Sequence, residues 1–200
     1  MDKRISNLLK ARHVISLPEL VEIVGHKTGV YRLVDKGELQ KVSPDGMGYF
    51  CLPTVDEGTA YFAIVKHYYP QCVVSGPTVL SLYDLGLDYI NKIDVDIPNS
   101  MNLKNDLMNV HRVVPRKITN VEERSFESKG IPFDIRVYSP ERTLFEAYRY
   151  YKGLDSYFYA IRKFAEFYLD RENPGKQFNL ILKINKKMGQ EILNLLQMEI

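Results

Sequence analysis

The chain has 200 residues, 45% of them hydrophobic, so it is long enough for two modest domains with real cores. No run of about 18 apolar residues occurs, and the opening MDKRISNLL has no long apolar segment, so we expect a cytoplasmic protein without membrane insertion or export. The net charge of +2 does not by itself indicate a nucleic-acid partner. Cys51 and Cys72 lack metal-ligand spacing and are expected to be buried.

Three short helices are predicted at the amino terminus. Apolar residues recur at helical spacing from Ile5 and again from Leu17, where Ser16 can serve as the N-cap. Gly25 allows a sharp turn, and a third apolar stripe ends at Gly37, the expected C-cap. Together the three helices can enclose one small core. The third stripe consists of Val30, Leu33 and Val34.

The third helix carries residues suited to a DNA major groove on the half opposite its apolar stripe. Arg32 could bind guanine or phosphate, and Tyr31 and Thr28 could contact phosphate or a thymine methyl group. Lys27 and Lys36, at its two ends, could hold the DNA backbone. A solvated helix face with no binding role is the alternative interpretation.

A β-hairpin is predicted directly after this helix. Strands at residues 39–42 and 49–52 are joined by the turn SPDGMG, and the order of three helices and a ribbon is typical of a winged helix-turn-helix. Lys41 and Met47 of the wing would then reach phosphate or the minor groove. We therefore predict a DNA-binding domain over residues 1–55, with a winged helix that contacts only protein as the alternative.

A second domain is predicted over residues 56–200. The segment DEGT separates the wing from a new apolar stretch, and later segments alternate between strand and helix patterns. The fold class is therefore α+β, with a winged helix-turn-helix followed by a mixed α/β domain that has a small sheet and carboxy-terminal helices. Strands are predicted at 93–97, 110–114 and 133–138, and helices at 139–151, 155–168 and 185–198. A further helix is predicted after the segment Ser75-Gly76-Pro77, with Ser75 or Thr78 as its cap.

Asp94 and Asp96 are the only pair of residues here that suggests catalysis. Two acids on one face of a strand can hold Mg²⁺. Their spacing along the chain from a glycine-containing turn loosely resembles the arrangement in the core of nucleotidyltransferases. However, Pro77 removes a backbone donor at that turn, and no third carboxylate strand follows. We therefore expect the two aspartates at a solvent-facing edge of a half-buried strand, and a protein with no catalytic residues, metal or cofactor.

Four sequence blocks together resemble one known family, the AbiEi-type antitoxins. The blocks are VYRLVDKGELQKVSPDGMGYF, VVSGPTVLSLYDLGL, DVDIPNS and VYSPERTLFEAYRYYKGLD, in this order over nearly the whole chain. The resemblance implies the antitoxin of a type IV toxin-antitoxin system, which defends against phage by abortive infection. It also implies repression of the protein's own promoter through inverted repeats in double-stranded DNA, and neutralisation of a nucleotidyltransferase-like toxin without a stable complex.

Two alternative functions remain open: a nucleotidyltransferase-like enzyme with a DNA-targeting domain, and a winged-helix adaptor for proteins. If the chain is an antitoxin, four basic residues of the second domain are candidates for the antitoxin surface. Arg142 and Arg149 belong to the helix that begins after Ser139, where the alternative is charge pairing within that helix. Arg162 and Lys163 lie on the outer side of the next helix.

Overall fold

The computed structural model describes residues 2–42, 48–86, 91–103, 105–128 and 130–199. The chain forms two compact units, each built from several segments of the sequence. Helices and two sheets occur together, which agrees with the predicted α+β class. Unit 1 comprises Met1–Gln71, Leu103–Asn109 and Arg124–Ile135; unit 2 comprises Cys72–Asn102, Val110–Glu123 and Arg136–Ile200.

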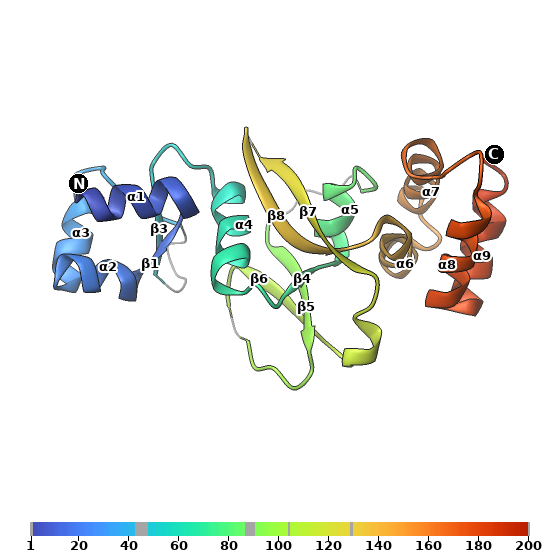
Figure 1. The fold of residues 1–200 in the computed structure, drawn as a ribbon, viewed down its shortest axis with the longest axis horizontal. Helices are drawn as coiled ribbons and strands as arrows, with labels where there is room; N and C mark the ends of the chain where they lie inside the picture. The colour runs from blue at the N-terminus through green and yellow to red at the C-terminus, as the bar shows by residue number, and fades with distance from the viewer. Residues whose placement is uncertain (1, 43–47, 87–90, 104, 129, 200) are drawn as a thin grey trace. The chain divides into compact units, whose positions relative to one another are not determined.

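Unit 1 begins with three helices beside a small antiparallel sheet (Figure 1). The sheet order is β1-β3-β2, and β1 is a strand that the sequence did not predict. One apolar cluster joins the three helices to this sheet, with Leu20, Val30 and Phe50 fully buried. The elements of this part are α1 (Lys3–Arg12), β1 (Ile15–Ser16), α2 (Leu17–Val24), α3 (Lys27–Asp35), β2 (Gln40–Lys41), β3 (Tyr49–Cys51) and α4 (Glu57–Tyr68).

Local sequence signals explain where α2 and α3 begin and end. Ser16 and Glu19 form a capping box at the start of α2, which confirms Ser16 as its N-cap. The helix ends at Gly25, whose φ of 91° is a left-handed conformation that favours glycine. Lys36 is the C-cap of α3, and Gly37, the predicted C-cap, follows it with a φ of 69°.

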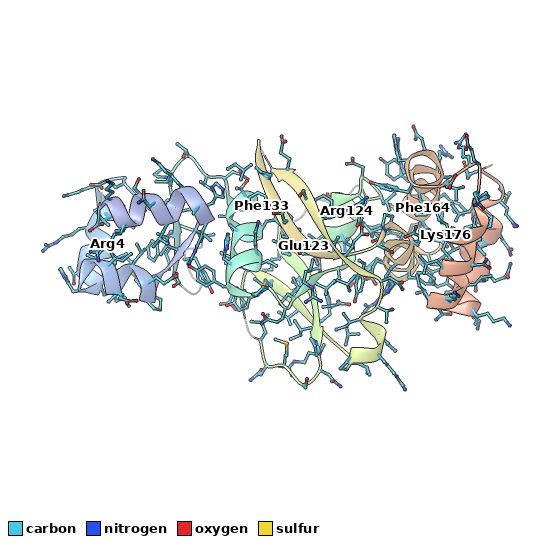
Figure 2. The ribbon with its side chains drawn as sticks, in the orientation of Figure 1. Arg4, Glu123, Arg124, Phe133, Phe164 and Lys176 are labelled. Carbon is cyan, nitrogen blue, oxygen red and sulfur yellow. The ribbon has the colours of Figure 1, made fainter. Side chains whose placement is uncertain are left out.

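Helix α4 is hydrogen-bonded to the elements before it. The Tyr68 hydroxyl accepts a bond from the backbone N of Ser16 at 2.8 Å and donates to Glu19, and the hydroxyls of Tyr49 and Tyr69 are 2.9 Å apart. Unit 1 therefore continues past residue 55, and the functional boundary expected there stays a prediction. Later strand residues belong to the same unit: Phe133, labelled in Figure 2, has its ring in contact with that of Phe62 of α4.

The larger sheet has the order β6-β5-β4-β8-β7. Strand β4 pairs antiparallel with β5 and parallel with β8, so this sheet is mixed, as predicted. The helix predicted after Ser75 is α5, with Ser75 as its N-cap residue. The elements are β4 (Val73–Val74), α5 (Gly76–Leu82), β5 (Ile93–Pro98), β6 (Met108–Val113), the short 3₁₀ helix η1 (Pro115–Lys117), β7 (Val121–Ser128) and β8 (Ile131–Tyr138).

Four helices complete unit 2: α6 (Pro140–Tyr151), α7 (Asp155–Phe167), α8 (Gly175–Ile184) and α9 (Lys186–Leu196). Ser139 caps α6 as predicted, and Pro140 takes the first helical position. Helix α6 packs against the other three, and Phe164 of α7 is fully buried in this region (Figure 2).

None of the helices in the described part of the chain has the length and apolar character needed to span a membrane. Both cysteines are buried, as expected.

Candidate functional site

Helix α3 presents one side to the core of unit 1 and the other to solvent. Val30 is fully buried, whereas Leu33 and Val34 are half-buried. Gly29 allows α2 to approach closely, because a Cβ there would lie 2.4 Å from Cγ1 of Val24. The inward stripe thus fixes the rotation of α3 and determines which of its residues face outward.

The five residues predicted for the outer face of α3 are all exposed. Lys27 lies over the ring of Tyr31, with 5.8 Å between its Nζ and the ring centroid. The same ring packs edge-on against Phe50 of β3. This contact packs Tyr31 against the central strand of the small sheet, and 37% of its surface remains exposed. The exposed residues are Lys27, Thr28, Tyr31, Arg32 and Lys36.

The outer face of α3 carries more positive than negative charge. Lys27, Arg32 and Lys36 contribute three cations, and within the described part of the chain none of them forms an ion pair with a carboxylate. Asp35 is the one acid in α3. Unpaired, exposed cations of this kind can bind phosphate without first breaking an internal pair.

Of the two predicted wing residues, Lys41 lies within the described chain and Met47 lies outside it. Lys41 belongs to β2, is half-exposed, and stands opposite Phe50 in the strand register. The Phe50 ring also contacts Tyr31, so the strand partner of Lys41 packs against α3.

Two of the four basic residues predicted for the antitoxin surface line one cleft, and the other two do not. Arg142 and Arg149 line the same cleft of unit 2, but Arg142 is only 13% exposed and pairs with Glu146 at 2.7 Å, as the charge-pairing alternative expected. On α7, Lys163 pairs with Glu166 in its own helix and Arg162 lies 3.8 Å from Glu199. Neither α7 residue lines that cleft.

Asp94 and Asp96 are buried, which corrects the expectation of a solvent-facing edge. They are 6% and 1% exposed, because the first turn of α5 covers this face of β5. Thr78 donates to Asp94 at 3.0 Å, and Ser75 donates to Asp96 at 2.7 Å. The alternation of IDVDI indicated two distinct strand faces but not that helix α5 would cover the acidic one.

Two further groups complete the hydrogen bonding of these carboxylates. The Tyr138 hydroxyl donates to Asp96 at 2.6 Å, and burial raises the pKa of Tyr138, with the Asp96 charge and the hydrogen bond acting in the same direction. His111 lies 3.2 Å from Asp94, and this hydrogen bond raises the pKa of His111 even though burial opposes the shift. The aspartates therefore organise the interior of unit 2 through hydrogen bonds with hydroxyl groups and an imidazole.

A cleft of about 640 Å³ opens beside this buried network. Its basic lining includes three residues that were not predicted as site residues: Arg112, Arg116 and Lys117. Arg112 falls within the strand predicted at 110–114, and the sequence pattern did not show that helices α6 and α9 would stand opposite this region. Figure 1 shows η1, which carries two of these cations, projecting beyond the sheet.

No model of a known protein family matches the chain, and no curated protein sequence matches it.

Proposed function

We propose that the amino-terminal part of unit 1 binds double-stranded DNA through the outer face of α3 and acts as a transcriptional regulator. The observation that carries this proposal is the cluster of exposed, unpaired Lys27, Arg32 and Lys36 on one short helix, with Tyr31 beside them. Positive charge and hydrogen-bond donors aligned on one helix match the combination of phosphate and base contacts that DNA recognition uses.

The arrangement of elements supports the same proposal. The order helix, strand, helix, helix and two strands, with the sheet β1-β3-β2, is consistent with the winged helix-turn-helix that we propose. In such domains the helix in the position of α3 enters the major groove, which is wide enough to admit one helix. Lys41 of β2 then lies on the side where a wing contacts the DNA backbone.

The antitoxin role rests on the resemblance of four sequence blocks to AbiEi-type antitoxins. This resemblance implies a cytoplasmic repressor that binds inverted repeats in its own promoter. It also makes unit 2 the part that counters a nucleotidyltransferase-like toxin without a stable complex. Arg149 is the residue of the predicted antitoxin surface that combines exposure with a place in the cleft, so it is the first position to substitute.

A double variant, Arg32→Ala with Lys36→Ala, tests DNA binding. We expect the affinity for a labelled duplex from upstream of the protein's own gene, measured by fluorescence anisotropy, to fall about 100-fold or more, since a base contact and a phosphate contact are both removed. The matched control is Arg171→Ala with Lys187→Ala, which removes the same charge from exposed positions in unit 2 and should leave the affinity unchanged.

The same variants separate DNA binding from the antitoxin role. With the toxin encoded by the adjacent reading frame, we expect the double variant to restore growth as well as the unsubstituted protein. If growth rescue and DNA binding were lost together in a folded variant, the division of roles between the two units would be wrong. If the unsubstituted protein showed no salt-sensitive binding to the duplex, the adaptor alternative would replace DNA binding.

A further inference from the structure

We infer that the cleft of unit 2 binds a nucleoside phosphate, with the phosphates held by its arginines and the base by its apolar side. This activity is separate from DNA binding by unit 1 and does not depend on it. The cleft lies between β6, η1, α6 and the start of α9. Its basic residues are Arg112, Arg116, Lys117, Arg142 and Arg149.

The charge of the cleft favours an anionic ligand. Only two carboxylates line it, Asp96 and Glu146, and both already have partners. Asp96 accepts from Ser75 and Tyr138, and Glu146 pairs with Arg142. The other four cations are all exposed, so the cleft presents a net positive charge to a ligand.

Arg142 is fixed in place before any ligand binds. Its guanidinium lies 4.3 Å from the centroid of the Tyr138 ring, and one of its nitrogens donates to Oε1 of Glu146 at 2.7 Å. An arginine held in this way loses little conformational freedom when it binds phosphate. Oε2 of Glu146 is buried without a hydrogen-bond partner among the described residues, a cost that a ligand hydroxyl or amino group would relieve.

The rest of the lining suits an aromatic base better than a second phosphate. Val114, an apolar residue of this lining, is 41% exposed and can therefore contact a ligand in the cleft. Phe145, Tyr148 and Met188 add aromatic and sulfur-containing surface to the same cleft. Besides Asp96, Glu146, Thr119 and Asn185, the lining combines cationic with apolar side chains, so it offers contacts both to phosphate and to a base.

The volume of the cleft distinguishes a nucleotide from a simple anion. Sites for ligands of drug or nucleotide size enclose roughly 300–1,000 Å³, and the cleft falls within this range at about 640 Å³. Phosphate or pyrophosphate would fill a small part of that space and leave the apolar lining uncovered. We therefore expect nucleoside triphosphates to bind more tightly than either inorganic ion.

Titration calorimetry of the full chain with ATP, GTP, CTP and UTP tests the assignment, with phosphate and pyrophosphate as further ligands. We expect at least one nucleotide to bind with a dissociation constant of about 1–100 μM and to raise the thermal midpoint. Arg149→Ala should weaken that binding about tenfold or more. Arg162→Ala removes the same charge from an exposed position outside the cleft and should bind as the unsubstituted protein does.

Three results would overturn the nucleotide assignment. The first is no heat or thermal shift with any nucleotide at millimolar concentration. The second is equal weakening by Arg149→Ala and Arg162→Ala, which would mean general attraction by surface charge. The third is inorganic pyrophosphate, or a single-stranded oligonucleotide, binding as tightly as the best nucleotide. Because Arg32→Ala with Lys36→Ala leaves the cleft intact, that variant should bind nucleotide normally even if DNA binding by unit 1 were disproved.

Discussion

Glu19 receives hydrogen bonds from three different parts of unit 1. Arg12 donates to Oε1 at 2.8 Å, and the backbone N and hydroxyl of Ser16 donate to Oε2 at 3.1 and 2.8 Å, with Tyr68 as a further donor. Burial on its own would raise the pKa of Glu19, but the hydrogen bonds and the Arg12 charge outweigh it and lower that pKa. The carboxylate thus links α1, the start of α2 and α4.

We predict that Glu19→Gln lowers the free energy of unfolding by about 1 kcal/mol at pH 7, the usual cost of weakening such hydrogen bonds. The folded-state pKa lies below the ordinary value of 4.5, so this contribution is present above pH 4.5 and is lost as pH falls through the folded pKa. Urea denaturation at several pH values should show the two proteins converging under acid conditions.

The control for this prediction is Glu22→Gln, an exposed glutamate of the same helix. It should change the free energy of unfolding very little at any pH, because surface charges usually contribute less than about 0.5 kcal/mol. A stability difference for Glu19→Gln that stayed constant down to pH 3 would mean that the charge of the carboxylate is not what matters.

Single residues show which local features the sequence could predict. Ser16 and Ser139 were recognised as helix caps because capping depends on residues three positions apart. The partners of Asp94 and Asp96 could not be recognised, because Thr78 is 16 residues and Tyr138 is 42 residues away along the chain. Only folding brings such pairs together, and no fixed spacing along the chain identifies either pair in the sequence.

At the scale of elements, long periodic segments were predictable and short or charged ones were not. The helices now seen as α6, α7 and α9 were predicted within about two residues of their observed ends, because each has an apolar stripe at helical spacing. Strand β1 has two residues and exists through its pairing with β3. Strand β7, with the sequence VEERSFES, has too few apolar residues to stand out as a strand.

Helix packing between α8 and α9 depends on Gly189. A Cβ at this position would lie 2.9 Å from the backbone oxygen of Ile181, and backbone atoms cannot move aside as a side chain can. We predict that Gly189→Ala destabilises the protein by about 1–3 kcal/mol, although alanine is the better helix former by about 1 kcal/mol. Urea denaturation followed by circular dichroism measures the change.

Gly175→Ala is the matched control, because the nearest atom to a Cβ there is 4.0 Å away and the residue begins α8. It should be neutral or slightly stabilising, since the new methyl group meets open space and alanine reduces the freedom of the unfolded chain. If both variants were equally stable, the close approach of α8 and α9 at Gly189 would not limit their packing.

At the scale of the whole molecule, the sequence indicated two parts but not how the chain is divided between them. The segment at 56–59 has the composition of a linker, yet Tyr68 and Tyr69 form hydrogen bonds with the elements before it. Segments as distant as Leu103–Asn109 and Arg124–Ile135 also belong to unit 1. Contacts between distant segments leave no local signal in the sequence, so a division made along the chain cannot show that these segments join unit 1.

The small net charge of the molecule bears on how it would bind DNA. With a net charge of +2 over 200 residues, the chain lacks a general attraction to polyanions, so affinity has to come from a few local contacts. The candidate contacts near α3 are four cations, namely Lys27, Arg32, Lys36 and Lys41. Each phosphate that a cation neutralises releases counterions from the DNA, so the salt dependence of binding counts these contacts.

We predict that DNA binding weakens as salt is added. A plot of the logarithm of the association constant against the logarithm of salt concentration should have a slope of about −3 to −4 for each bound protomer. Lys36→Ala should reduce the magnitude of this slope by about 1, because one phosphate contact is lost. Anisotropy titrations at several salt concentrations measure both values. A slope of about −8 or steeper per protomer would mean that a much wider basic surface contacts DNA, and that α3 and β2 are only part of the interface.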